Sequence, residues 1–274
     1  MLQVHQFACL SDNYGFLLHD PGSQETACID TPDAEAYLRE ANAKGWQITQ
    51  IWNTHWHPDH AGGNAAIKAA TGCVITGPAE VEKLGTAPDR VVAAGDTVAL
   101  GEFSAHVIDV SGHTNGHIAY HLPEADTAFV GDAVFALGCG RMFEGQPDQF
   151  WASLSRIKAL PPATLLYCAH EYTASNARFA LHADPDNAEL ADYAAHNNFC
   201  MFCSLVYYLT FNDIPRRCSI SFVRSQLGRL DKARFRPILA KSRSIRRALR
   251  LQRKNGTFRP KSWPIFLKKH GLIG

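Results

Sequence analysis

The sequence predicts an α/β fold, and three observations support this prediction. Up to about residue 190, short β-rich runs alternate with helical patterns, which is typical of mixed α/β folds. The 274 residues, of which 46% are hydrophobic and 19% are charged, are enough for a full buried core in one large domain or two. Histidine and aspartate residues follow four of the β-rich runs, so the chemistry is expected where strands end.

Strands are expected where apolar or β-branched residues cluster, and helices where a helical pattern runs up to a glycine or a proline. The expected strands cover residues 49–52, 73–76, 106–110, 118–122, 127–130 and 164–168. The expected helices cover residues 34–43, residues 64–70 ahead of Gly72, and residues 148–160 ahead of Pro161.

A residue that can bind a metal follows each of four expected strands. These residues are His55 after 49–52, His113 after 106–110, Asp132 after 127–130 and His170 after 164–168. Because the loops at strand ends of a layered α/β fold can converge on one rim, the four side chains are expected to be neighbours.

The stretch THWHPDH (54–60) crowds three histidines and an aspartate into one turn. Side chains two residues apart in extended backbone point to the same side, so His55 and His57 are expected to point together. Pro58 helps to hold His57 out of the helical region. The turn that follows reverses the side-chain direction, which allows Asp59 and His60 to face a second position. One loop can therefore begin two metal sites.

Imidazole and carboxylate groups make up the candidate ligand set, which is His55, His57, Asp59, His60, His113, Asp132 and His170. These donors suit Zn(II), Fe(II) or Mn(II), and the absence of a nearby thiolate argues against a structural cysteine-type zinc site. The set is large enough for a dinuclear site if one carboxylate bridges, and Asp132 is the expected bridge. His117 is expected to support the ligands rather than to bind metal.

We expect a cytosolic, monomeric protein without a membrane segment. The N-terminus MLQVHQFACLSDNYG lacks the basic and apolar regions of a secretory signal. The apolar run over residues 199–211 is interrupted by Ser204 and Thr210 and is too short to span a bilayer. Eight cysteines in a chain of this length fit reduced thiols better than a disulfide framework.

The charge of the chain changes abruptly near residue 195. Residues 1–195 carry 9 Lys and Arg against 24 Asp and Glu, a net charge of −15, whereas residues 196–274 carry 18 against 2, a net charge of +16. Two different compositions have therefore been joined in one chain.

Four segments of the chain resemble the metallo-β-lactamase fold superfamily. In order, they are THWHPDHAGGN, SGHTNGH, VGDAVF and CAHEYT. The resemblance implies an αββα sandwich, but this fold supports several activities and does not name a substrate. The segments GCGRMFEG (138–145) and HEYTASN (170–176) resemble more closely the glyoxalase II family, the hydroxyacylglutathione hydrolases. Persulfide dioxygenases share GCGR and the first metal histidines, but they lack the FEG and HEYT continuations.

The resemblance to glyoxalase II implies where substrate binds. Arg141 and Tyr172 match the residues that contact the glutathione part of the thioester, and Asn176 matches a position near the glutathione. Phe143 stands where the family often has a tyrosine, so its ring could stack but not donate a hydrogen bond.

The same resemblance implies a thioesterase with two divalent metal ions, of which zinc is preferred and iron or manganese are alternatives. It would hydrolyse S-(2-hydroxyacyl)glutathione, such as S-D-lactoylglutathione, to glutathione and D-lactate in methylglyoxal detoxification. Asp59 is the candidate catalytic residue, because it is placed to orient the attacking water. The first metal would take His55, His57 and His113, the second Asp59, His60 and His170, and both would share Asp132.

The resemblance covers residues 1–193 and then stops, because the family's GxPTxP-type and NPFLR-type segments are missing. We therefore expect a catalytic domain over residues 1–175 and an atypical basic C-terminal segment over residues 176–274. Three explanations compete for the tail: a changed reading frame near residue 195, a genuine basic domain, or a strongly diverged glutathione domain.

A second function class follows from that tail. The chain would then be a catalytically impaired metallo-hydrolase scaffold whose basic segment binds nucleic acid or other anions, since a segment of this charge attracts phosphates. Another metallo-β-lactamase-fold hydrolase or a persulfide dioxygenase is the remaining alternative.

Overall fold

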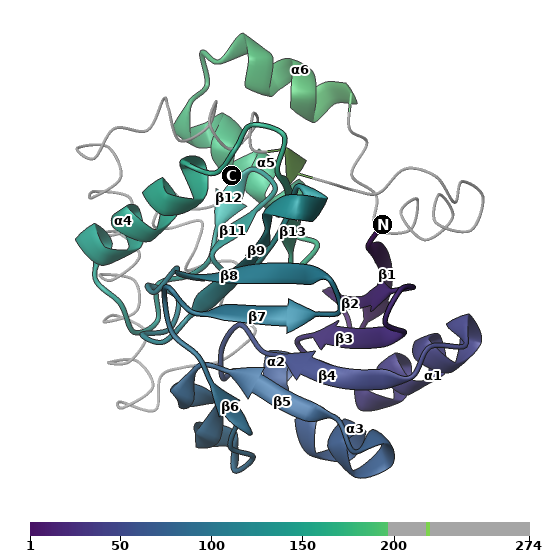
Figure 1. Cartoon of the computed structure of the whole chain (residues 1–274). Helices are drawn as coiled ribbons and strands as arrows, with labels where there is room; N and C mark the ends of the chain where they lie inside the picture. Colours follow the sequence, from purple (N-terminus) through teal and green to yellow (C-terminus); the bar gives the residue numbers. More distant parts are fainter. Residues whose placement is uncertain (197–217, 220–274) are drawn as a thin grey trace, which may run out of the picture. The chain divides into compact units, whose positions relative to one another are not determined.

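A computed structural model describes residues 1–196 and 218–219 of the chain (Figure 1). The expectations for the rest of the basic tail lie outside the described residues, and the boundary at residue 175 stays a prediction. Within the described part, two six-stranded sheets pack face to face and helices cover their outer sides. This arrangement is the αββα sandwich that the sequence predicts.

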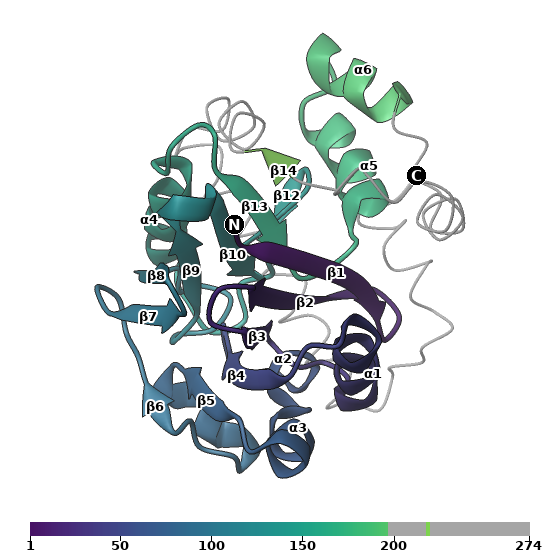
Figure 2. The same cartoon turned by 45° about the vertical axis from the view of Figure 1, so that its right-hand side comes forward.

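The first sheet has the order β1-β2-β3-β4-β5-β6 (Figure 2). Its strands are β1 (Gln3–Cys9), β2 (Asn13–Asp20), β3 (Glu25–Ile29), β4 (Ile48–Trp52), β5 (Val74–Gly77) and β6 (Arg90–Val91). The first three strands are antiparallel, and β3 to β6 are parallel. The parallel strands are connected through α1 (Ala34–Lys44), α2 (Pro58–Ala61), α3 (Asn64–Thr71) and the 3-10 helix η1 (Ala79–Leu84).

The second sheet has the order β14-β13-β10-β9-β8-β7. Its strands are β7 (Thr97–Leu100), β8 (Phe103–Asp109), β9 (Ile118–Leu122), β10 (Thr127–Gly131), β13 (Leu165–Cys168) and β14 (Cys218–Ser219). Only β10 and β13 are parallel among the pairs described in this sheet. The remaining elements are the 3-10 helix η2 (Pro123–Ala125), the ribbon of β11 (Val134–Phe135) and β12 (Gly138–Cys139), and the helices α4 (Pro147–Lys158), α5 (Thr173–Ala183) and α6 (Ala188–His196).

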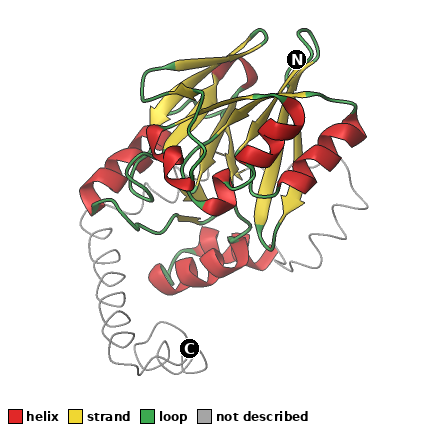
Figure 3. Cartoon of the chain, turned by 90° about the horizontal axis from the view of Figure 1, so that it is seen from below, coloured by secondary structure: helices red, strands yellow, loops and turns green. Residues whose placement is uncertain are grey.

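The alternation of side chains along β4 shows how the sheets are held. Trp52 belongs to the apolar core between the two sheets, where it meets Tyr120 of β9. Its neighbour Ile51 points the other way, into a second core with Tyr37 of α1 and Ile67 of α3. Burial of each such side chain contributes about 1.5–3 kcal/mol, so both faces of β4 stabilise the fold. Figure 3 shows the helices lying around the strands.

The expected strands and helices are all present, with ends shifted by at most a few residues. The pattern did not predict the strands β1, β2, β3 and β7, the short elements β6, β11, β12, β14, α2, η1 and η2, or the helices α5 and α6. No helix among residues 1–196 is long and apolar enough to cross a membrane.

Candidate metal centre

The loop after β4 brings its histidines together as the sequence predicts. His57 is extended, with φ −60° and ψ 148°, and Pro58 is the first residue of α2. The imidazoles of His55 and His57 therefore converge, with Nε2 of His55 3.0 Å from Nδ1 of His57. The short helix then turns Asp59 and His60 toward a different point, which His170 shares.

His113, which follows β8, completes a first donor group with His55 and His57. Its Nε2 lies 3.0 Å from Nδ1 of His57, the same atom that faces His55. Neighbouring nitrogens around a tetrahedral zinc are roughly 3.3 Å apart, because each Zn–N bond is about 2.0–2.1 Å long. The spacing of the three nitrogens therefore fits one bound cation.

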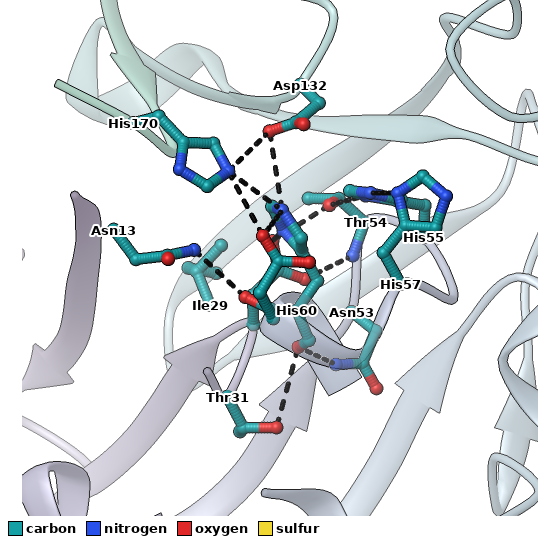
Figure 4. Close-up of polar contacts among 12 residues, drawn as sticks. Asn13, Ile29, Thr31, Asn53, Thr54, His55, His57, His60, Asp132 and His170 are labelled. Carbon is teal, nitrogen blue, oxygen red and sulfur yellow. Dashed lines mark hydrogen bonds and ion pairs between the residues drawn. The ribbon is translucent and has the colours of Figure 1, made fainter. Parts of the chain in front are cut away.

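A second group consists of Asp59, His60 and His170. Figure 4 labels His60 and His170 of this group, together with Asp132. The Nε2 atoms of the two imidazoles are 3.3 Å apart. Oδ2 of Asp59 lies 3.8 Å from Nε2 of His60 and 3.5 Å from Nε2 of His170. These three donors fit a second cation of the same kind.

Asp132 lies between the two groups. Its Oδ1 is 3.3 Å from Nε2 of His60 and 3.2 Å from Nε2 of His170, whereas its Oδ2 is 3.2 Å from Nε2 of His113. Within the described part of the chain, Oδ1 is buried and accepts no hydrogen bond. A buried carboxylate oxygen normally has a partner. One oxygen facing each group is the geometry of a bridging ligand.

Gly131 allows Asp132 to take this position. Its φ is +50°, in the left-handed region that favours glycine. A Cβ at this residue would lie 2.6 Å from Oγ1 of Thr54 and 2.8 Å from Cε1 of His117. The turn after β10 is therefore restricted to a residue without a side chain.

Hydrogen bonds from outside the groups fix the tautomers of the imidazoles. Nδ1 of His113 donates to the carbonyl oxygen of Arg141 (2.7 Å), and Nδ1 of His170 donates to Oδ1 of Asp12 (2.8 Å). Nδ1 of His60 donates to Oδ2 of Asp30 (2.9 Å). Each acceptor holds a proton on Nδ1, which leaves the Nε2 lone pair directed into the site.

Asp30 also acts on His55, through Thr54. Its Oδ1 accepts from the backbone N–H of Thr54 (2.7 Å) and its Oδ2 from the Thr54 hydroxyl (2.8 Å). Because this hydroxyl donates to Asp30, it accepts from Nδ1 of His55, 3.0 Å away. One buried carboxylate thus orients an imidazole of each group.

Sequence reasoning missed Asp12 and Asp30. Asp30 directly follows β3, but residues 25–29 are not among the expected strands, so the strand-end rule did not reach it. Asp12 lies in the β1–β2 turn, and only the packing of that turn against His170 reveals its role.

The charges and burial of the site favour the metal-binding forms of Asp132, His55 and His113. Burial alone would raise the pKa of Asp132, but the attraction of His60 and its neighbours holds it well below the usual value. Burial lowers the pKa of His113 to about 4 and that of His55 well below the usual value. At pH 7 Asp132 is therefore ionised and His55 and His113 are neutral.

At His60 the carboxylates of Asp132 and Asp30 outweigh burial and raise the pKa well above its usual value, and Asp132 likewise raises the pKa of His170. A cation at the second group would have to displace protons from these two imidazoles.

His117 supports the site without joining either group. Its Nε2 accepts from the backbone N–H of Asp132 (3.0 Å), and its ring stacks on His55 at 4.5 Å between centroids. This placement agrees with the expected supporting role.

A cavity of about 270 Å³ opens beside the two groups. Its lining includes His113 and Asp132 from the site and the predicted substrate residues Arg141, Tyr172 and Asn176. The ring of Tyr172 stacks on His170, with centroids 4.9 Å apart and an interplanar angle of 1°. Two of the predicted ligands and three predicted substrate residues thus meet at one cavity.

Phe143 and Asn176 have structural contacts as well. Phe143 is 46% exposed, and its ring lies 4.7 Å from the guanidinium carbon of Arg141 and 5.1 Å from the ring of His113. Nδ2 of Asn176 donates to the carbonyl oxygen of Ala136 (3.0 Å). Phe143 is therefore placed to stack beneath Arg141.

The chain is similar to proteins of known family. The family model described as "Metallo-beta-lactamase superfamily" matches residues 15–170. A hydroxyacylglutathione hydrolase of Erythrobacter litoralis is 74% identical over 193 residues, which are 70% of this chain and 76% of the relative. One of Hyphomonas neptunium is 62% identical over 196 residues, 71% of this chain and 76% of the relative. The crystal structure of TTHA1623 in a di-iron-bound form superposes with a TM-score of 0.52 and 26% identity, and covers 62% of this chain and 92% of that one.

Proposed function

The chain belongs to the metallo-beta-lactamase superfamily and, within it, to the hydroxyacylglutathione hydrolases, and on this premise we propose that it hydrolyses S-(2-hydroxyacyl)glutathione thioesters. S-D-lactoylglutathione is the proposed substrate, and glutathione and D-lactate are the products. The proposed role of this reaction is the detoxification of methylglyoxal. The cytoplasmic location and the monomeric state remain predictions from the sequence.

The observation that carries the proposal is the position of Asp132. Its two carboxylate oxygens face two separate groups of donors, and the same residue lines the cavity that contains Arg141 and Tyr172. A substrate held by those side chains would lie beside both groups at once. This adjacency is what hydrolysis of a bound thioester requires.

The donors fit two divalent cations. His55, His57 and His113 would hold one, and Asp59, His60 and His170 the other, with Asp132 shared. Neutral imidazole and carboxylate suit zinc, which we propose as the resident metal, with iron or manganese as alternatives. The di-iron form of the related fold supports a two-metal site.

The reaction joins a water oxygen to the thioester carbonyl carbon and breaks the carbon–sulfur bond. When bound, the metal pair supplies Lewis acidity and makes hydroxide available near neutral pH. Asp59 is proposed to orient the attacking water, because its side chain is 42% exposed and borders the second group. Its carboxylate can accept a hydrogen bond from that water.

Residues of the cavity would hold the glutathione part. Arg141 is proposed to pair with a carboxylate of the peptide, and the hydroxyl of Tyr172 to donate to it; burial raises the pKa of Tyr172 to about 12, so the hydroxyl keeps its proton. Phe143 would stack beneath the guanidinium, and Asn176 would border the peptide. The leaving thiolate has a low enough pKa to depart without a protein acid.

The test compares metal content and turnover in one set of proteins. Zinc-loaded wild type should bind two zinc ions per chain and hydrolyse S-D-lactoylglutathione. The His57→Ala and Asp132→Ala variants should lose zinc and activity together, because each removes a proposed ligand. The control His106→Ala changes an exposed histidine of β8 and should retain both. Near-normal turnover by either ligand variant would rule out the dinuclear mechanism.

A further inference from the structure

The segment that carries Arg141 and Phe143 wraps around His113. The carbonyl oxygen of Arg141 accepts from Nδ1 of His113 (2.7 Å), and the backbone N–H of Phe143 donates to the carbonyl oxygen of His113 (3.2 Å). Gly145 donates in turn to the carbonyl oxygen of Gly112 (3.2 Å). The proposed substrate contacts therefore share their backbone with the support of a proposed metal ligand.

The side chain of Glu144 connects this segment to two further loops. Its Oε1 accepts from the indole N–H of Trp56 (3.2 Å), and its Oε2 accepts from the backbone N–H of Asn115 (2.8 Å). Trp56 lies between His55 and His57 in the sequence, and Asn115 follows His113 by two residues. One carboxylate thus joins the substrate segment to both loops that supply the first donor group.

A second glutamate anchors the loop after β8 independently. Glu80 of η1 accepts from the Thr114 hydroxyl (2.5 Å) and from the backbone N–H of Gly116 (2.9 Å). Lys83 lies 3.7 Å from Glu80 and 3.5 Å from Glu144, so it partly neutralises both carboxylates. If Glu144 were removed, Glu80 would still hold the loop of His113, whereas residues 141–145 would lose the side-chain hydrogen bonds that join them to Trp56 and Asn115.

We propose that Glu144 is a positioning residue that fixes the distance of Arg141 and Phe143 from the first donor group, His55, His57 and His113. This inference rests on the proposed function, because Arg141 and Phe143 matter only if glutathione binds there. Loss of the Glu144 hydrogen bonds should weaken recognition of the glutathione peptide much more than it weakens metal binding or the chemical step.

The experiment uses the zinc-loaded full chain and two substrates. One is S-D-lactoylglutathione, and the other is S-D-lactoyl-N-acetylcysteamine, which has the same acyl group but no glutathione peptide. For Glu144→Ala we expect KM for the glutathione thioester to rise about tenfold and kcat to fall by no more than about threefold. For the small thioester kcat/KM should fall by no more than about threefold, and two zinc ions per chain should remain bound.

Two further variants keep the result interpretable. Glu144→Gln retains an oxygen that can accept from one donor, so it should recover a large part of the KM effect if Ala folds poorly. Glu82→Ala removes an exposed glutamate of η1 and should behave as wild type.

An unchanged KM in Glu144→Ala, an equal loss with both thioesters, or a loss of zinc would each overturn the positioning role. Wild type that hydrolyses neither thioester would overturn the proposed function and this inference with it.

Discussion

Replacement of Asp30 by asparagine should damage metal binding far more than folding. The two side chains have the same shape, but asparagine has one oxygen and an NH₂ donor. The backbone N–H of Thr54 can neither turn nor lose its proton, so we expect the asparagine oxygen to accept from it. The NH₂ group then faces the Thr54 hydroxyl and Nδ1 of His60, which donate to Oδ2 of Asp30 in the wild type. Donor would then meet donor at both contacts.

In this orientation the contacts are relieved by moving protons. His60 would transfer its proton from Nδ1 to Nε2, and the Thr54 hydroxyl would turn to donate to Nδ1 of His55, which moves that proton to Nε2 as well. In both imidazoles Nε2 is the atom that faces the donor groups. A protonated nitrogen cannot bind a cation. Each site therefore loses a ligand, unless metal binding returns the proton from Nε2 to Nδ1.

The size of the effect follows from the number of imidazoles involved. Loss of an outer hydrogen-bond partner of a ligand lowers metal affinity about 10- to 100-fold. This corresponds to about 1.4–2.8 kcal/mol for each cation. Because Asp30 reaches one imidazole of each group, we expect both zinc affinities to fall by that factor in Asp30→Asn.

The assay is a titration of the zinc-loaded protein against a chelator of known affinity, with the metal content measured at each step. Asp33→Asn is the matched control, because Asp33 caps α1 through the N–H of Ala36 and asparagine caps a helix equally well. Two zinc affinities in Asp30→Asn within threefold of wild type would refute the tautomer argument.

Two other outcomes follow from single contacts. Gly131→Ala places a Cβ against Thr54 and His117 at a φ of +50°, so it should destabilise the protein by about 1–3 kcal/mol; thermal unfolding measures this, and an unchanged Tm would contradict the restriction at this turn. Phe143→Ala removes the ring beneath Arg141, a contact of about 0.5–1 kcal/mol at an exposed site. KM for S-D-lactoylglutathione should rise about two- to fivefold with little change in kcat, and equal KM values would show that the stacking does not position Arg141.

The candidate ligands could be found from the sequence because local rules place them. An HxH spacing in extended backbone and a position directly after a buried strand are both visible along the chain, and they identify His55, Asp132 and His170. Asp30 also follows a buried strand, but the pattern did not predict that strand, β3, so the rule did not find Asp30.

Glu144 and Asp12 could not be found in this way. Each acts through a hydrogen bond to a loop far away in the sequence, and such a bond depends on how two turns pack rather than on a repeating pattern. The short strands β6, β11, β12 and β14 were missed for a related reason, since two residues carry no period and only their partners make them strands.

The candidate ligands come from loops of both sheets, because His55, His57 and His60 follow β4 of the first sheet and Asp132 and His170 follow strands of the second. Cations held by these groups would cross-link the two halves of the sandwich in the way that a disulfide links two segments. Their binding free energy would then become part of the folding free energy, and a tenfold rise in free zinc would add about 1.4 kcal/mol for each saturable position. The unfolding temperature of the protein would thus rise with the concentration of free zinc.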